Sequence, residues 1–176
     1  MGWKTYVRPI TLEQAQAFVL EHHRHNKPPH RCRFSMGLNL VDEFGLHGGD
    51  QLVGVVMIGR PVARMLDDGV TAEVIRLCVN DRAPRGSYSK LYRAAWRAWA
   101  AMGGHAMITY TLQSECGSSL RGAGWIRDAE LRGRTGMAWC NRDGRDDHDV
   151  VREPKVRWRV ARGCHDDPQQ EPATRA

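Results

Sequence analysis

The sequence contains no apolar run long enough to cross a membrane, and its first ten residues lack the hydrophobic segment of a signal peptide. These absences favour a soluble, cytoplasmic protein without a membrane partner. The five cysteines are irregularly spaced and form no Cys-x-x-Cys pair, which argues against a disulfide framework and a zinc knuckle. Internal repeats and the composition shift of a second domain are also absent.

The composition that remains is typical of one globular domain. With 176 residues, 41% of them hydrophobic, the chain is long enough to bury a core without covalent staples. We expect this domain to span residues 1–162, and residues 163–176 have the polar, Pro-bearing composition of a disordered tail. The formal charge of +6 favours a polyanionic partner or an anionic cofactor, although a merely solvated basic surface explains it equally well. The oligomeric state is not indicated.

The stretch from residue 71 to residue 111 has the pattern of a βαβ unit. Residues 71–80 are an apolar run suited to a strand buried on both faces, and residues 105–111 are again strand-like. Between them, residues 90–104 carry apolar side chains at helical spacing and end in two glycines. The pattern predicts an α/β fold with a parallel pair of strands and a right-handed crossover.

The turn before the predicted helix is a candidate anion site. A strand-to-helix turn offers backbone N–H groups and the positive end of the helix dipole. The side chains that would accompany them are arginines and hydroxyls, with one glycine. The candidate cofactor-binding residues are Arg82, Arg85, Gly86, Ser87 and Ser89. We expect Ser87 or Ser89 to cap the helix, which should run to about Met102.

The N-terminal half predicts a strand, a helix and two antiparallel strands. Residues 3–10 alternate weakly, and Thr11 to Gln14 form a capping box at the start of a helix that should end before the two prolines at 28–29. Residues 32–41 and 51–62 then have the pattern of a hairpin.

A histidine-rich segment follows the predicted helix. His22 and His25 lie three residues apart and could point the same way as metal ligands. The alternative is a solvated basic helix end, where the helix dipole favours histidine. No nearby acidic or cysteine residue completes a ligand set, which favours the alternative.

Glu73 is the one carboxylate within the apolar strand at residues 71–80. Burial raises the pKa of such a group toward the range useful for a general base. The competing interpretation is an ion pair, since a buried carboxylate is costly unless it is paired. The arginines available for that pair are Arg60, Arg64 and Arg76.

Polar side chains follow the second strand of the βαβ unit, where ligand sites of α/β proteins gather. Tyr110 and Ser114 lie there and are the candidate proton donors toward a leaving group, Tyr110 being the stronger. A short helix at 118–125, closing strands within 126–142 and 154–162, and a charged loop between these strands complete the predicted order.

This order of elements resembles the GNAT acyltransferase fold over roughly residues 3–162. The stretch VIRLCVNDRAPRGSYSKLY resembles the strand, pyrophosphate-binding turn and helix of that family, and SSLRGAGW resembles its short helix ending in a Gly-aromatic pair. The resemblance implies a mixed sheet with a central parallel βαβ unit and flanking helices. It also implies an acetyl-coenzyme A or other acyl-donor site at the turn, and a splay of the two parallel strands with Glu73 and Tyr110 facing one cleft.

A second resemblance is to small phage and prophage proteins, carried by five motifs. They are HHRHNKP at 22–28, GRPVARMLDDG at 59–69, EVIRLC at 73–78, AAWRA at 94–98 and TYT at 109–111. In organisation the chain is also similar to the Mom-type phage proteins, which use a GNAT-like fold to add a carbamoylmethyl group to adenine. This likeness is an analogy of fold and partner.

Two functional hypotheses follow. The first is a transferase that adds an acyl or related small group to an amine, with a nucleic-acid base as the favoured acceptor, as in phage DNA modification or anti-restriction. A base in a duplex would be flipped out and stacked on an aromatic ring. Trp96, Trp99 and Trp139 are available, although the helical spacing of Trp96 and Trp99 favours core packing.

The second hypothesis is a non-catalytic nucleic-acid-binding or anti-defence module, because Ser87 and Ser89 stand where GNAT turns have glycines. Both hypotheses make DNA a partner through phosphate contacts. The candidate nucleic-acid-binding residues are Arg24, Lys27, Arg31, Arg33, Arg142 and Arg145.

Overall fold

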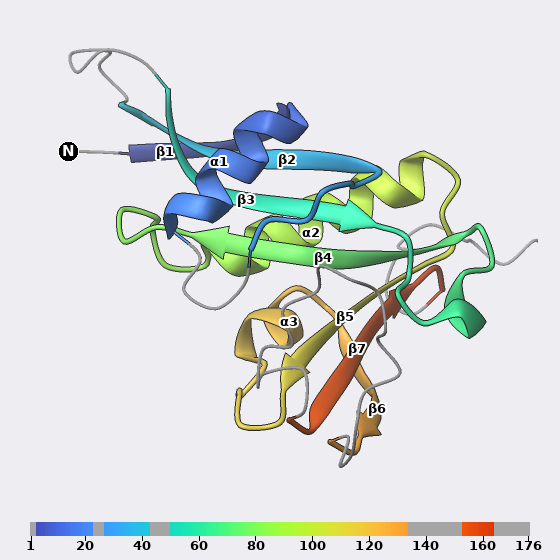
Figure 1. The fold of residues 1–176 in the computed structure, drawn as a ribbon. Helices are drawn as coiled ribbons and strands as arrows, with labels where there is room; N and C mark the ends of the chain where they lie inside the picture. The colour runs from blue at the N-terminus through green and yellow to red at the C-terminus, as the bar shows by residue number, and fades with distance from the viewer. Residues whose placement is uncertain (1–2, 23–26, 43–49, 134–152, 164–176) are drawn as a thin grey trace, which may run out of the picture.

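A computed structural model describes residues 3–22, 27–42, 50–133 and 153–163. Its strands form one seven-stranded sheet in the order β1-β2-β3-β4-β5-β7-β6 (Figure 1). The strands are β1 (Trp3–Ile10), β2 (Phe34–Asp42), β3 (Gln51–Gly59), β4 (Thr71–Val79), β5 (Ala106–Leu112), β6 (Ile126–Leu131) and β7 (Lys155–Ala161). The helices are α1 (Leu12–His22), α2 (Ser87–Ala101) and α3 (Ser118–Gly122), with a 3-10 helix, η1 (Arg64–Leu66).

The sheet is mixed, as the sequence predicts. Strands β4 and β5 are parallel and are joined through α2, whereas the other neighbouring pairs are antiparallel. The parallel pairing is short: it runs from Thr71 opposite Ala106 to Glu73 opposite Ile108 and then ends. Beyond this point β5 diverges from β4, and β7 and β6 follow it (Figure 1).

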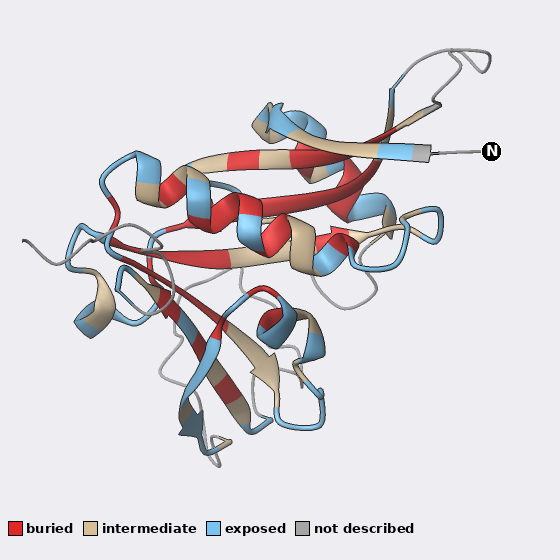
Figure 2. Ribbon diagram, turned by 180° about the vertical axis from the view of Figure 1, so that it is seen from behind, coloured by how far each residue is buried: buried red, intermediate tan, exposed pale blue. Residues whose placement is uncertain are grey.

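Helices α1 and α2 cover opposite faces of the sheet, and each face has its own apolar core. On one face Leu91 and Ala95 of α2 pack with Val56 of β3 and their neighbours. On the other face Phe18 of α1 packs in a smaller cluster. Strand β3 contributes to both cores and is therefore buried on both sides (Figure 2). This double burial explains its continuous run of apolar residues.

The start of α1 confirms the predicted capping box. The Gln14 N–H donates to the Thr11 hydroxyl at 3.2 Å, and the Thr11 N–H donates to the Gln14 side-chain oxygen at 3.1 Å. These reciprocal bonds satisfy two backbone donors that a helix start leaves unpaired.

Strand β3 ends at Gly59, three residues before the predicted end at residue 62. Pro61 follows almost immediately and has no N–H to donate to a sheet ladder, so the chain leaves the sheet there. Residues 60–70 instead form a connection that contains η1.

Trp96 and Trp99 are both core residues, each with 7% of its surface exposed. Their burial confirms the prediction of core packing. The prediction that a flipped base stacks on one of these two rings is wrong, because a stacking ring must be accessible. The Trp99 indole N–H lies 3.1 Å from the Val70 carbonyl and 2.9 Å from the Ala106 carbonyl. It therefore ties α2 to the starts of both parallel strands.

Several predictions fall outside the described residues. These are the charged loop, Trp139, the part of the closing strands beyond residue 133 and the tail from residue 164 onward. No helix among the described residues is long and apolar enough to span a membrane.

Candidate active site

Glu73 lies at the point where the pairing of β4 and β5 ends. Its side chain is buried, with 6% of the residue exposed. One carboxylate oxygen accepts a hydrogen bond from the Val62 N–H at 2.9 Å. Burial raises the pKa of Glu73, and this effect is opposed by the Val62 hydrogen bond and by the charge of Lys155. A carboxylate with a raised pKa in this position suits a general base.

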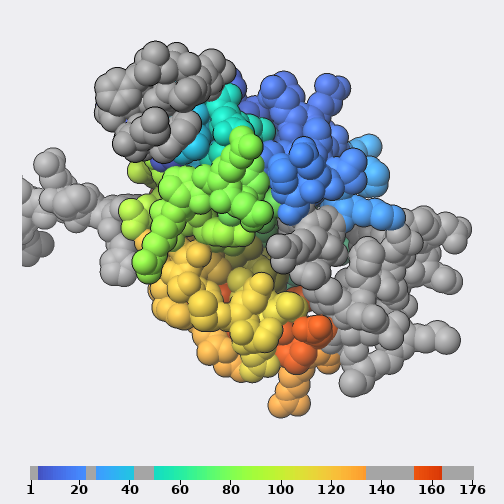
Figure 3. Space-filling view, turned by 90° about the vertical axis from the view of Figure 1, so that its left-hand side faces the viewer, coloured from blue at the N-terminus to red at the C-terminus, as the bar shows by residue number. Residues whose placement is uncertain are grey.

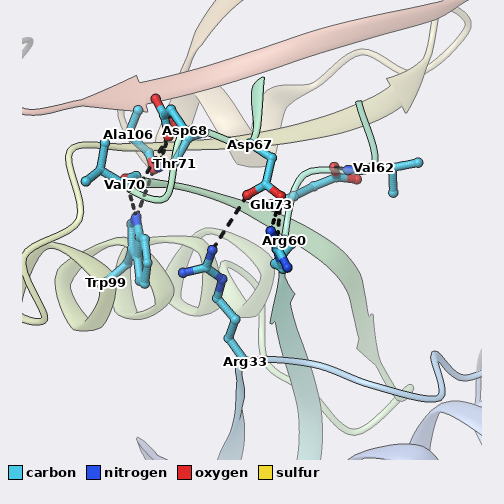
Figure 4. A network of polar contacts seen from close by, with 10 residues as sticks. All are labelled: Arg33, Arg60, Val62, Asp67, Asp68, Val70, Thr71, Glu73, Trp99 and Ala106. Atoms are coloured by element: carbon cyan, nitrogen blue, oxygen red, sulfur yellow. Dashed lines mark hydrogen bonds and ion pairs between the residues drawn. The ribbon is translucent and has the colours of Figure 1, made fainter. Parts of the chain in front are cut away.

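The arginines that the sequence offered as partners of Glu73 make other contacts. Arg60 pairs with Asp67 at 2.6 Å, and Arg76 donates to the Lys27 carbonyl at 3.0 Å (Figure 4 shows the first). Among the described residues, neither these two nor Arg64 forms an ion pair with Glu73. The ion-pair interpretation is therefore wrong for this part of the chain, where a backbone N–H satisfies the carboxylate instead.

Tyr110 lies on the same side of the sheet as Glu73. Glu73 is opposite Ile108, and Tyr110 is two residues further along β5, so the alternation of side chains places both on one face. Tyr110 is half-buried, and its pKa is raised by burial and then by the negative charge of Glu73. Glu73 and Tyr110 are therefore close enough for the carboxylate charge to act on the phenol.

Arg157 stands beside Tyr110 on β7 and was missed by the sequence interpretation. The register pairs the two residues directly, and the charge and hydrogen bond of Arg157 oppose the rise in the pKa of Tyr110. Arg157 also forms an ion pair with Asp128 of β6. Along β7, Lys155, Arg157 and Arg159 alternate with buried residues. This pattern is a sequence signal from which Arg157 could have been predicted.

A β-bulge lies next to Glu73 in β4. Val74 is opposite Ile58 and Arg76 is opposite Met57, so Ile75 is the additional residue without a partner on β3. A bulge interrupts the ladder and can redirect backbone polar groups. It occurs beside the carboxylate, where β4 has lost β5 as a partner.

The turn between β4 and α2 is exposed at the far end of β4. Figure 3 shows its green residues at the surface, between the blue N-terminal elements and the yellow-to-orange residues around α3. Arg82 and Arg85 are exposed, and Gly86 adopts φ +88° immediately before α2 begins. A Cβ at Gly86 would meet no atom within 4 Å, so the constraint there is the left-handed backbone itself.

The expectation that Ser87 or Ser89 caps α2 is wrong. Gly86 is the N-cap residue, and it makes no side-chain cap hydrogen bond. The Ser87 hydroxyl donates to the Pro84 carbonyl at 2.6 Å and the Ser89 hydroxyl donates to the Ser119 carbonyl at 2.8 Å. Both serines lie inside the helix, where their hydroxyls find carbonyls instead of N–H groups. The predicted extent of the helix is confirmed, since Met102 is its C-cap.

Acetyltransferases are among the solved structures that superpose on this chain. An IAA acetyltransferase from Bacillus cereus superposes with a TM-score of 0.59 at 13% identity, covering 90% of this chain and 99% of that one. An acetyltransferase from Bacillus subtilis in complex with CoA gives 0.54 at 13%, covering 90% and 99%. A protein from Desulfovibrio desulfuricans described as a GNAT-family acetyltransferase gives 0.57 at 15%, again covering 90% and 99%. No family model and no curated protein matches the sequence.

The chain has a GNAT fold. The mixed sheet with its central parallel βαβ unit, which the sequence predicts, is thereby confirmed. Within this fold Glu73 and Tyr110 lie where β4 and β5 separate, and the exposed turn lies at the open end of the separation.

The remaining predicted site residues are scattered over the GNAT fold. Ser114 is exposed in the turn that follows β5. His22 is half-buried against the Phe18 ring at 4.5 Å and lies 3.7 Å from Glu21, whereas His25 is outside the described residues. In the described part of the chain, no cluster of three or more metal-ligating side chains occurs.

The candidate nucleic-acid-binding residues have different surroundings. Arg31 is exposed, and Lys27 is exposed near the end of the histidine segment. Arg33 lies over the Trp99 ring at 4.8 Å and pairs with Asp67 at 3.9 Å, so its guanidinium is engaged within the protein. Arg24, Arg142 and Arg145 are outside the described residues.

Proposed function

We propose that the protein is an acyltransferase that moves an acyl group from an acyl-coenzyme A thioester to an amine. The observation that carries the proposal is the buried Glu73, which stands beside Tyr110 where the two parallel strands separate. The likeness of the fold to GNAT acetyltransferases, one of them solved with CoA, supports it.

Glu73 would act as the general base. An amine attacks only in its neutral form, so the carboxylate accepts the proton that the amine loses as its nitrogen bonds to the thioester carbonyl carbon. The carbon–sulfur bond then breaks, and Tyr110 gives its phenolic proton to the departing thiolate. N–H groups beside the Ile75 bulge are suited to stabilise the carbonyl oxygen while it is negative.

The β4–α2 turn would hold the pyrophosphate of the cofactor. The N-terminal end of a helix carries a partial positive charge, and no side chain caps α2. The Ser87 N–H already donates to the Pro84 carbonyl at 3.2 Å, so this end of α2 would attract phosphate through its dipole, together with Arg82 and Arg85. The serine hydroxyls would not take part because carbonyls already occupy them. Seven residues of extended chain separate Glu73 from Asn80, roughly 23 Å, a span that suits an extended cofactor.

Calorimetric titration tests this half of the proposal. We expect coenzyme A and acetyl-coenzyme A to bind, and Arg82→Ala with Arg85→Ala to weaken binding by about 10- to 100-fold, as loss of charge-assisted hydrogen bonds does. Arg127→Ala is the control, since Arg127 is exposed on β6 and pairs with Glu130 at 3.1 Å. Absence of heat at millimolar ligand would remove the cofactor from the proposal.

The acceptor that we propose is an amine of a nucleic-acid base, as in phage DNA modification. The formal charge of +6 supports a polyanionic substrate, and Lys27 and Arg31 are exposed cations. A new nucleoside mass in DNA from cells that express the protein tests the acceptor class.

Binding to DNA should depend steeply on salt. If the five candidate cations other than Arg33 contact phosphates, the association constant should fall by about 500-fold between 50 and 200 mM salt, because each contact releases counterions. Fluorescence anisotropy with a labelled duplex measures it, and Arg31→Gln should reduce the slope by about one contact. An affinity that is constant over this range would contradict the phosphate contacts.

A non-catalytic nucleic-acid-binding module is the second candidate. It is favoured by the β4–α2 turn, whose one left-handed glycine is followed by two serines. Such a module would show the same salt dependence but no heat with coenzyme A and no new nucleoside.

A further inference from the structure

The connection between β3 and β4 carries the backbone group that holds Glu73. Val62, whose N–H donates to the carboxylate, lies within this connection, residues 60–70. The Val62 and Met65 side chains are 71% and 94% exposed, whereas Pro61, directly before Val62, is buried. Burial of Pro61 fixes one end of the segment, and the residues that follow Val62 need another restraint if the Val62 N–H is to stay aimed at one oxygen.

Asp67 supplies that restraint. Its carboxylate accepts from the Arg60 Nε at 2.9 Å, and Arg60 Nη2 lies 2.6 Å away (Figure 4). Arg33 approaches the other oxygen at 3.9 Å without a hydrogen bond, and that buried oxygen has no hydrogen-bond partner among the described residues. The Asp67 side chain is 17% exposed whereas that of Arg60 is 72% exposed, so the pair is shielded from solvent at its Asp67 end only.

Arg33 is itself fixed to the rest of the fold. Its N–H donates to the Ile58 carbonyl at the end of β3, and its guanidinium lies 4.8 Å from the centre of the Trp99 ring. Asp67 therefore holds the connection to Arg60 at the end of β3 by a hydrogen-bonded ion pair, and the charge of Arg33, which lies against α2, attracts it from the other side. The next residue, Asp68, binds the N–H of Thr71 at 2.6 Å and secures the start of β4.

The pair between Arg60 and Asp67 closes a loop of the chain, and Val62 lies inside that loop. We propose that Asp67 is a positioning residue, whose ion pairs with Arg60 and Arg33 hold the Val62 N–H against Glu73. The effect that we expect on catalysis rests on the proposed function, whereas the position of the Val62 N–H does not depend on it.

The charged and polar groups around Glu73 determine in which direction its pKa moves when the Val62 hydrogen bond is lost. The Val62 N–H on the connection and Lys155 on β7 favour the carboxylate, burial opposes it, and Tyr110 faces it from β5. Loss of the Val62 hydrogen bond therefore raises the pKa of Glu73, and less of the base form is present at a given pH.

Titration of the Glu73 carboxyl carbon and the Val62 amide by NMR tests the proposal in Asp67→Ala. If Asp67 positions the Val62 N–H, the titration midpoint of Glu73 should move to higher pH by about one pH unit in this variant. The chemical shift of the Val62 amide should then no longer change with the ionisation of Glu73. A direct charge effect has the opposite sign, because removing a negative charge and releasing two arginines stabilises the carboxylate. A midpoint that is unchanged or moves to lower pH would overturn the proposal.

Arg60→Gln keeps the test decisive if Asp67→Ala does not fold, since the Arg60 side chain is 72% exposed. Hydrogen exchange of the Val62 amide should become at least about tenfold faster in this variant, whereas unchanged exchange contradicts the restraint. Glu130→Gln breaks an exposed ion pair on β6 and should change neither measurement. These readouts require no turnover, so they stand even if acyl transfer is not found. If it is found, the acid limb of the pH profile should move with the Glu73 midpoint.

Discussion

Glu73→Gln is expected to lower the rate of acyl transfer by about 100- to 10,000-fold and to leave the fold intact. The amide has the shape of the carboxylate and keeps an oxygen that can accept from the Val62 N–H, which lies 2.9 Å from Glu73. It cannot, however, accept a proton from the amine. The rate loss therefore isolates the base from the structural contact.

The measurements are nucleoside mass spectrometry for transfer and thermal unfolding for the fold. Glu130→Gln serves as the matched control, because it makes the same chemical change at an exposed position of β6. A Glu73→Gln protein that is stable and fully active would remove the catalytic role. A lowered melting temperature would assign Glu73 to structure.

The pKa of Glu73 determines how activity and stability depend on pH. Because burial raises the pKa in the folded state, activity should rise as the pH increases through that value and the base forms. Between the ordinary carboxyl pKa and the raised one, the folded state binds more protons than the unfolded state. Stability therefore falls as the pH rises through this window, and Glu73→Gln should not lose stability at neutral pH.

The sequence predicts the features of this fold that local patterns encode. The apolar run at 71–80, the helical spacing after it and the capping box at Thr11 each depend on neighbours a few residues away. Glu73 was found for the same reason, as a carboxylate in an apolar strand. Tyr110 followed from its place at the end of the next strand.

Contacts between distant segments could not be predicted in this way. Arg157 meets Tyr110 only because β7 inserts between β5 and β6, an order that chain sequence does not reveal. The choice of a backbone N–H over an arginine as partner of Glu73 depends on the path of residues 60–70. The prediction of a serine cap was wrong because α2 begins one residue after Gly86, so Gly86 occupies the N-cap position.

Trp99→Ala is expected to lower the free energy of unfolding by about 3–5 kcal/mol, the usual cost of removing a buried large aromatic side chain. For a protein of this size, this loss corresponds to a fall in melting temperature of roughly 6–20 °C. The Trp99 ring is 7% exposed, and its indole N–H bonds the carbonyls of Val70 and Ala106. Thermal unfolding followed by circular dichroism measures the change.

Trp99→Phe separates the two contributions, because it keeps an aromatic ring and removes the N–H. It should cost about 1–3 kcal/mol, since the Ala106 carbonyl loses a buried donor, whereas the Val70 carbonyl keeps the His105 N–H at 2.9 Å. Gly104→Ala approaches the same contact from the other side: its Cβ would lie 2.1 Å from the indole nitrogen, so the ring must shift. If Trp99→Phe were as stable as the wild type while Trp99→Ala was not, packing alone would account for the residue. A cost in Trp99→Phe would instead show that the indole N–H contributes to joining the starts of β4 and β5, just before the point where Glu73 ends their pairing, whereas Gly104→Ala should be destabilising in either case.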